Sequence, residues 1–500
     1  MLDRSTCRDC VDELPILPRA SGKPARPASV AFPNNPGTLV QSGTNQGIEP
    51  RSLGNLFHLS EQLLAYPLRD SASCGAKGIP RLYGQLLSKQ RLYEAFRHVK
   101  RNKGAAGIDG QSLSAFEVNL EVELSCLLLE LKEKRYRAQP VKRAVIAKDD
   151  GGERLLGIPT VRDRVVQQAL RSIIEPIFEP DFHPSSYGYR PGRSGHHAIG
   201  KAELFIRRYR REWVVDMDLS KCFDTLNHDL IIRQCRQRIT DGSVLSLLRQ
   251  FLESGVMVGY HLEETELGSP QGGVISPLIA NVYLDAFDQF MKARGHRIVR
   301  YADDILILCG SRAGAENALR VARSYLEDEL KLTVNATKTH IAQSADGVKF
   351  LGVVIHTTYT RIQDKKVAKL KQKLKILTKR NRGAGLAAII RELNPVLRGF
   401  ANYFRVANCA RVLRQVMGWV RRRLRCLQLK QWKKPARLHR RLKQLGYRPP
   451  FKFIKMQSWR NAASPLAHLA IPNTYLHEDL RLMDLTRVRT GITVPEFGVS

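Results

Sequence analysis

Along residues 76–360, the spacing of apolar residues switches repeatedly between the period of a helix and that of a strand. A helical stripe within residues 83–103 ends at Gly104. β-Branched residues on both sides of a turn at 149–152 predict a β-hairpin over residues 141–160. The other expected elements are helices over 120–134, 161–176, 244–254 and 314–330, a turn followed by a helix over 268–291, a strand leading into a helix over 212–231, a strand–turn–strand over 298–308, and short strands at 331–335 and 349–355.

These elements interleave irregularly, without the steady strand–helix alternation of a doubly wound parallel sheet, so residues 76–360 are expected to form an α+β domain. In residues 361–450 the apolar residues fall at helical spacing and the other faces are almost all cationic. A helical domain is expected there, followed by a C-terminal extension over residues 451–500. Residues 1–75 are rich in Pro, Ser and Gly and are expected to form a mostly disordered leader.

The chain carries 81 Lys and Arg residues against 47 Asp and Glu, a formal net charge of +34. Such an excess favours a polyanionic partner, because binding phosphates releases their counterions. A membrane surface and simple solubility are the alternatives. Residues 361–460 hold 30 Lys and Arg but only two acids, Asp364 and Glu392, so this block is the expected nucleic-acid-binding face. Charge reversals at 421–425 are expected to weaken that binding in a salt-dependent way.

The cysteines and the apolar segments indicate the compartment. Nine cysteines are scattered along the chain, without the regular pattern of a disulfide framework. The chain does not open with a long apolar stretch, and no uninterrupted apolar run is long enough to predict a transmembrane helix. A reduced, cytosolic setting without a membrane partner is therefore expected.

Two adjacent aspartates, Asp303 and Asp304, interrupt the strongly apolar segment around residues 298–308. Burying two unpaired carboxylates is costly or forces protonation, and a bound divalent cation removes that cost. The apolar strand ending near residue 218 supplies Asp216 and Asp218 on one face. Carboxylates from separate strands that meet at one point suit two-metal phosphoryl chemistry, for which hard oxygen ligands favour Mg²⁺. The alternative is that Asp303 and Asp304 are ordinary turn residues.

Several motifs in order resemble those of group II intron-encoded reverse transcriptases. YADD at 301–304 resembles the signature of reverse transcriptases, and DLSKCFD at 218–224 resembles their first metal-binding motif. Further blocks of the family resemble NKGAAGIDG (102–110), SSYGYRPGRSGHHA (185–198), SPQGGVISPLIANVYL (269–284) and, in the maturase domain, LNPVLRGFANYFR (393–405). The resemblance implies a right-hand reverse transcriptase, with fingers and palm built on antiparallel sheet at 76–360 and an α-helical thumb/maturase domain at 361–450.

The resemblance also implies roles for single residues. Asp218, Asp303 and Asp304 would bind two Mg²⁺ ions, with the backbone carbonyl of Leu219 as a further ligand. Asp216 is expected to have a supporting or solvent role. Phe223 would be a gate beneath the sugar that selects dNTPs, and Gln271 would contact the nucleotide. Lys148 and Arg154 would contact the triphosphate, and Lys338 would protonate the leaving pyrophosphate. Arg190 and Arg193 would contact the template. Ordinary core or surface roles are the alternatives.

The implied function is an RNA-directed DNA polymerase that binds its parent intron RNA, assists splicing and copies RNA into DNA during retrohoming. Its partners would be group II intron RNA, the DNA target and a primer, in the bacterial cytoplasm and at the nucleoid when it acts on DNA. The alternatives are an RNA-binding maturase without polymerase activity and a host-captured reverse transcriptase in phage defence or repair; a homodimer also stays open. Because residues 450–500 hold no cysteine and only two histidines, the family's metal-nuclease module is expected to be absent.

Overall fold

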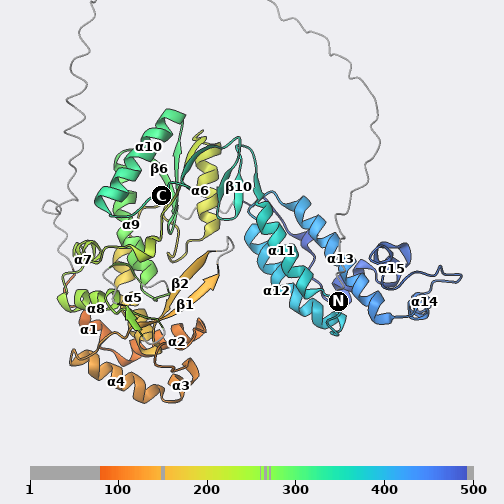
Figure 1. The fold of residues 1–500 in the computed structure, drawn as a ribbon, viewed down its shortest axis with the longest axis horizontal. Coiled ribbons are helices and arrows are strands. Elements are labelled where there is room, and N and C mark those ends of the chain that lie inside the picture. The colour runs from red at the N-terminus through yellow and green to blue at the C-terminus, as the bar shows by residue number, and fades with distance from the viewer. Residues whose placement is uncertain (1–78, 148–151, 259–260, 264–266, 270–271, 493–500) are drawn as a thin grey trace, which may run out of the picture. The chain divides into compact units, whose positions relative to one another are not determined.

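The computed structural model describes residues 79–492 except 148–151, 259–260, 264–266 and 270–271 (Figure 1). The expected leader over residues 1–75 and most of the expected hairpin turn therefore lie outside the described residues. The N-terminal part contains helices α1 (Tyr83–Leu86), α2 (Lys89–Arg101), α3 (Leu113–Val118), α4 (Leu120–Lys132), α5 (Val161–Phe178) and α6 (Gly195–Arg207). Side-chain hydroxyls cap the N-termini of several of these helices. Ser88 accepts a hydrogen bond from the N–H of Arg91 at the start of α2, and Thr160 accepts one from the N–H of Asp163 at the start of α5.

The expected hairpin is present as antiparallel strands β1 (Val141–Ala147) and β2 (Glu153–Ile158). Strand β4 (Val256–Val258) pairs with β1 in parallel, and β5 (His261–Glu263) pairs with β4, which gives the order β2-β1-β4-β5. Helix α5 continues two residues past Pro176, because a proline in the last turn removes few helical hydrogen bonds.

A second sheet has the antiparallel order β6-β7-β3-β8. Its edge strand β6 is labelled in Figure 1. Its strands are β6 (Arg297–Tyr301), β7 (Asp304–Cys309), β3 (Trp213–Asp218) and β8 (His340–Gln343), and the accompanying helices are α7 (His228–Arg236), α8 (Gly242–Leu252), α9 (Ser276–Ala293) and α10 (Arg312–Ser324). The strand predicted at 331–335 is wrong: only Val334 forms an isolated bridge there, with Leu219. The short strand β8 takes its place in the sheet.

The two faces of this sheet pack into different hydrophobic cores. Val215 of β3 and Ile307 of β7 lie in one core with α5 and α7 to α10. Val214 and Leu306, on the opposite face, lie in the other core with α6 and the C-terminal helices. Alternating side chains of a strand point to opposite faces, so the apolar strands of this palm-type sheet are buried on both sides.

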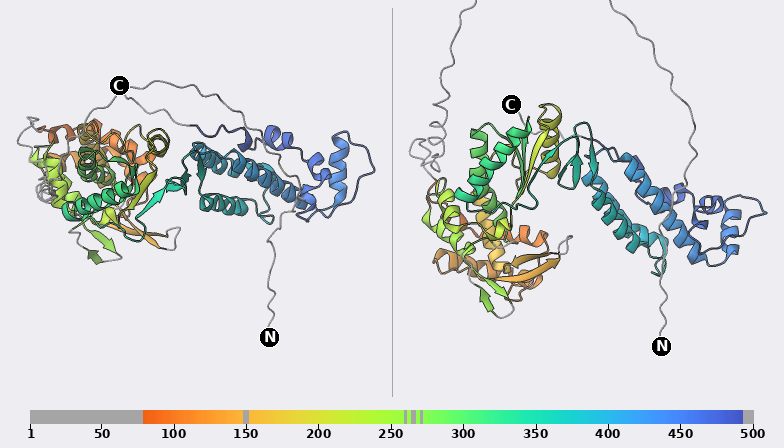
Figure 2. Two further views of the ribbon diagram at one scale, coloured as in Figure 1. Left: turned by 90° about the horizontal axis from the view of Figure 1, so that it is seen from above. Right: turned by 45° about the horizontal axis from the view of Figure 1, so that its top comes forward.

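The described residues after β8 form a small sheet followed by helices. The sheet has the order β11-β10-β9, from β9 (Val348–Phe350), β10 (Val353–Ile355) and β11 (Thr360–Ile362). The helices are α11 (Asp364–Leu377), α12 (Leu386–Phe404), α13 (Ala410–Trp432), α14 (Pro435–Gln444) and α15 (Pro465–Ala470). Helices α11 and α12 are in contact, as are α12 and α13, and all three can be followed in Figure 2. None of the described helices is both long and apolar enough to cross a membrane.

Candidate active site and nucleic-acid interface

The predicted metal-binding carboxylates converge at one end of the palm-type sheet. Asp218 is the last residue of β3 and Asp304 the first residue of β7, and the two are direct partners across the antiparallel pair. Directly opposed residues of such a pair have Cβ atoms about 4.5–5.5 Å apart. Asp303 lies in the turn between β6 and β7, directly after Ala302, which adopts a left-handed φ of 60°. We call residues 302–304 the acidic turn. Asp218 thus forms one acidic site with Asp303 and Asp304, which follow it in the chain by 85 and 86 residues.

This site holds more negative charge than its surroundings balance. Burial, followed by Asp216, Asp303 and Asp218, raises the pKa of Asp304 to about 7. Burial is also the largest cause that raises the pKa of Asp303. Asp216 lies on the same face two residues before Asp218, and burial raises its pKa to about 6. Half-buried carboxylates that repel one another are stabilised by a cation.

The donor chemistry of the site fits Mg²⁺, which prefers hard oxygen ligands. Within the described residues, however, no three His, Cys, Asp or Glu side chains are grouped closely enough to hold a metal ion. Mg²⁺ is commonly bound through one or two carboxylates together with substrate phosphates and water, without an all-protein cage. An open set of carboxylates is therefore compatible with an ion that arrives with a nucleotide.

A segment after α10 is fastened to the end of β3 and brings a lysine to the site. The N–H of Asn335 donates to the carbonyl of Asp218 (2.9 Å), and its side-chain Nδ2 donates to Asp218 Oδ2 (3.2 Å). Nζ of Lys338 lies 3.3 Å from the same oxygen, on a side chain that is 61% exposed. Leu219 forms its bridge with Val334 beside these contacts. The structure thus brings Lys338 and Leu219 to Asp218, and it adds Asn335, which the motifs did not indicate.

The predicted sugar gate contacts an aromatic residue that sequence reasoning missed. Phe223 follows β3 in a short 3₁₀ turn and is half-buried. The ring of Tyr189 meets it edge-on, with centroids 6.3 Å apart. Burial, and then Asp303, raises the pKa of Tyr189, so Tyr189 also lies near the acidic turn. The only sequence signal for Tyr189 is its place in the motif YGYRPG.

The predicted triphosphate contacts are only partly visible. Arg154 lies exposed on β2, and its charge lowers the pKa of Asp303, although burial of Asp303 outweighs it. Lys148 and Gln271 lie outside the described residues. Ser269, which precedes Gln271 by two residues, donates its N–H to the carbonyl of Phe223 (2.7 Å). Ser269 is thus held beside Phe223, the predicted sugar gate.

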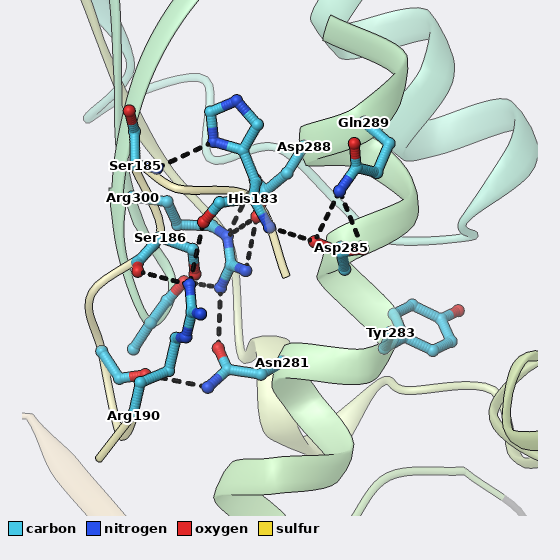
Figure 3. A network of polar contacts seen from close by, with 12 residues as sticks. His183, Ser185, Ser186, Arg190, Asn281, Tyr283, Asp285, Asp288, Gln289 and Arg300 are labelled. Atoms are coloured by element: carbon cyan, nitrogen blue, oxygen red, sulfur yellow. Dashed lines mark hydrogen bonds and ion pairs between the residues drawn. The ribbon is translucent and has the colours of Figure 1, made fainter. Parts of the chain in front are cut away.

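A buried polar network around Arg300, shown in Figure 3, reaches the acidic turn through the carbonyl of Ala302. Arg300 and Asp288 are completely buried and form a bidentate pair at 2.6 to 2.9 Å. Arg300 also donates to Asn281 Oδ1 (3.0 Å) and to the carbonyl of Ala302 (3.1 Å) in the turn. Asn281 in turn donates to the carbonyl of Gly188, beside Tyr189 (2.8 Å). One arginine therefore links α9, the acidic turn and the loop that carries Tyr189.

The expectation for Arg190 is wrong. Its guanidinium is buried, pairs with Glu179 at 2.8 Å and donates to the carbonyls of His183 and Ser186, so it has no free donor face for a template. Arg193 stands over the ring of Tyr187, 5.5 Å from the centroid, and donates to the carbonyl of Pro184. Both arginines stabilise the loop that packs on the acidic turn. Backbone acceptors of this kind cannot be read from a motif.

The arginines at 421–425 also have internal partners. Arg421 donates to His477 and Asp484, and Arg422 donates to the carbonyl of Trp459 and stands over its ring. Arg425 is buried and donates to the carbonyl of Ile471 (2.9 Å) and to Asn473 (2.8 Å); burial lowers its pKa to about 10. These residues connect α13 with the C-terminal segment. Charge reversals there are therefore expected to disturb the fold before they report on nucleic-acid binding.

A palm-type antiparallel sheet with carboxylates at the end of its central strands, followed by a helical region, defines the reverse transcriptase class of fold. The comparisons agree: residues 146–355 match the model described as "Reverse transcriptase (RNA-dependent DNA polymerase)", and residues 367–446 match "Group II intron, maturase-specific domain". The chain belongs to the family of group II intron-encoded reverse transcriptases and maturases.

Relatives of known sequence support this membership. The chain is 38% identical to Protein YkfC of Escherichia coli (strain K12), over 55% of this chain and 82% of YkfC. It is 30% identical to the group II intron-encoded protein LtrA of Lactococcus lactis subsp. cremoris, over 54% of this chain and 56% of LtrA. It is 28% identical to the putative COX1/OXI3 intron 2 protein of Saccharomyces cerevisiae, over 53% of this chain and 38% of that protein. The chain thus spans most of YkfC but little more than half of LtrA.

Proposed function

We propose that this protein is an RNA-directed DNA polymerase that binds group II intron RNA, assists its splicing and copies RNA into DNA during retrohoming. The observation that carries the proposal is the cross-strand pairing of Asp218 with Asp304, with Asp303 in the adjoining turn. Carboxylates from two strands at one sheet end are what in-line nucleotidyl transfer requires.

In this proposal Asp218, Asp303, Asp304 and the carbonyl of Leu219 would hold two Mg²⁺ ions. When bound, such ions activate the attacking hydroxyl and neutralise charge on the phosphates. The protein's own part is to place the primer 3′-hydroxyl in line with the α-phosphate of a dNTP. The 3′-hydroxyl gives its proton to water as a bond forms between its oxygen and the α-phosphorus, the bond from that phosphorus to the bridging oxygen breaks, and pyrophosphate leaves.

The residues around the carboxylates have separate parts in this reaction. Phe223 would pack beneath the sugar and exclude a 2′-hydroxyl, and the ring of Tyr189 packs edge-on against it. Arg154, together with Lys148 and Gln271, would hold the triphosphate and the nucleotide. Lys338 would give its proton to the leaving pyrophosphate. Its present contact is Asp218, so it must exchange that carboxylate for the phosphate when a nucleotide enters.

A primer-extension assay on an RNA template tests the polymerase function. Asp303→Asn and Asp304→Asn should each abolish dNTP incorporation while they leave the affinity for intron RNA almost unchanged, because the removed charges lie in the acidic turn. Asp346→Asn, which changes an exposed turn carboxylate elsewhere, is the matched control and should extend the primer normally.

Extension by Asp303→Asn/Asp304→Asn at the wild-type rate would refute the site. Intron RNA binding by a wild-type protein that never extends a primer would instead favour the maturase without polymerase activity. Extension without affinity for intron RNA would favour the host-captured enzyme.

A further inference from the structure

A cationic cavity of about 710 Å³ lies between the C-terminal end of α11 and one face of α13. Its volume is within the roughly 300–1,000 Å³ of typical ligand sites. Five cations line it, Lys375, Lys379, Arg380, Arg423 and Lys430, and none of the described residues in its lining is acidic. The cavity lies within the maturase-specific domain and is formed by helices that do not carry the carboxylates described above.

Cations at the C-terminal end of a helix often only satisfy its free carbonyls and its dipole. Here other side chains make these contacts. Arg423 donates to Thr378 Oγ1 (2.5 Å) and to the carbonyls of Lys375 and Thr378 (3.3 and 3.2 Å). Arg382 donates to the carbonyl of Leu377 (2.8 Å). Since the end of α11 is already capped, the lysines of the cavity are not needed for capping.

Three of the cations have no internal partner. Among the described residues, the side chains of Lys375, Lys379 and Lys430 have no hydrogen bond or ion pair. The two acids of residues 361–460 are engaged elsewhere: Asp364 pairs with Arg361 (3.0 Å) and Glu392 with Arg382 (2.8 Å). Positive charges gathered without counter-charges repel one another, so an anion in the cavity would be stabilised by all of them.

The remaining lining residues indicate which anion fits. Ile376 is 59% exposed, a large apolar side chain among cations. Gln372 and Asn381 contribute amide groups, which can donate and accept hydrogen bonds. A free phosphate would use only the lysines. A nucleotide unit of RNA uses all three kinds of group: phosphate oxygens for the lysines, the apolar face of a ribose for Ile376, and a 2′-hydroxyl for an amide.

We propose that this cavity binds the sugar–phosphate backbone of structured RNA, with phosphates on Lys375, Lys379 and Lys430 and a ribose against Ile376. The inference rests on the proposed binding of intron RNA and specifies where that RNA is held. It also replaces the arginines at 421–425 as the expected contact, because Arg423 already donates to Thr378 and to two helix carbonyls, whereas the three lysines have no partner among the described residues.

The test is the triple variant Lys375→Gln/Lys379→Gln/Lys430→Gln in the full chain, titrated with a fluorescein-labelled RNA stem–loop at several salt concentrations. Three lost phosphate contacts should lower the affinity about ten- to a hundredfold and reduce the slope of log K against log salt by about 2–3. The matched control is Lys365→Gln/Lys373→Gln/Arg411→Gln, which removes three exposed cations of the same two helices outside the cavity.

Equal losses in the two triple variants would overturn the proposal, because the charge would then act without a specific site. An unchanged affinity of the cavity variant would overturn it as well. Titration with an RNA–DNA hybrid separates two sources of backbone: a loss for the stem–loop alone supports intron RNA, and a loss for the hybrid alone would overturn the assignment to structured RNA. Primer extension on a short, preannealed template–primer should stay within a few-fold of wild type, so failure of the cavity and failure of the polymerase site remain distinguishable.

Discussion

The buried pair behind the acidic turn gives the sharpest test of how this protein positions its carboxylates. Arg300 is fully buried, bonds to both oxygens of Asp288 and reaches the carbonyl of Ala302 in the turn. The substitution Arg300→Met keeps much of the side-chain volume but removes the charge and every donor. It leaves the Asp288 carboxylate buried without its partner.

The expected stability changes follow from the burial of both charges. Removing one partner of a buried ion pair costs about 3–5 kcal/mol, because the remaining charge stays desolvated. Replacing both partners by apolar residues of similar size is often close to neutral. Arg300→Met should therefore lower the free energy of unfolding by about 4 kcal/mol, and Arg300→Met/Asp288→Leu should recover most of this loss.

Activity should not recover with stability. Neither variant restores the hydrogen bond to the Ala302 carbonyl, which supports a residue in the left-handed conformation directly before Asp303. A displacement of reacting groups by about 1 Å can cost about a hundredfold in rate. The double variant should therefore fold normally but show a kcat about a hundredfold below wild type, with the KM for dNTP within a few-fold.

The measurements are urea unfolding and steady-state primer extension as a function of dNTP and Mg²⁺ concentration. Arg425→Met is the control, since it removes a buried arginine of the helical region and should lose stability with little change in kcat. A double variant with both wild-type stability and wild-type kcat would show that the pair only stabilises the fold. A double variant less stable than Arg300→Met would contradict the desolvation reasoning itself.

Three further predictions use other parts of the chain. Burial, and then Asp288, raises the pKa of Asp285 to about 6, so ionisation of this carboxyl lowers the stability of the fold as pH rises from about 4 to 6. Asp285→Asn should therefore raise the free energy of unfolding by up to about 3 kcal/mol at pH 8 and leave it unchanged at pH 4. Urea titrations at both pH values measure this difference. Phe223→Val should increase incorporation of rNTPs relative to dNTPs in single-nucleotide extension, and an unchanged ratio would refute its role as the sugar gate. Arg425→Met should lower the free energy of unfolding by about 1–3 kcal/mol and leave the slope of log K against log salt for RNA binding unchanged. A smaller slope would show that Arg425 contacts RNA phosphates.

The carboxylates could be found from sequence because their pattern is local. A strand with Asp at its end and a strand–turn–strand with Asp in the turn are each visible as apolar residues interrupted by acids. Their meeting follows once both strands enter one antiparallel sheet, and the register then sets Asp218 opposite Asp304. The assignment of these residues as ligands stays a prediction, as do the expected domain boundaries.

The partners of the buried polar groups could not be found in this way. Asp288 lies on α9 among apolar residues, and nothing in its spacing shows that it faces Arg300 rather than solvent. Strand β8 was missed because its four residues, His340–Gln343, include two polar ones and lie at the edge of the sheet. The motif reading of Arg190 failed for a related reason, since its acceptors are the Glu179 carboxylate at the end of α5 and backbone carbonyls nearby, none of which the motif shows.

The positive charge of the maturase-specific domain divides between two kinds of side chain. At 421–425 the arginines lie largely inside the fold, where a planar guanidinium can satisfy several carbonyls and carboxylates at once. The ammonium groups of the cavity lysines have no partner among the residues that the structure describes, as expected for a strongly hydrated point charge on a flexible stem. Net charge alone therefore does not locate the RNA-binding surface. Substitutions of the arginines at 421–425 should chiefly change unfolding, and substitutions of the cavity lysines should chiefly change the salt dependence of RNA binding.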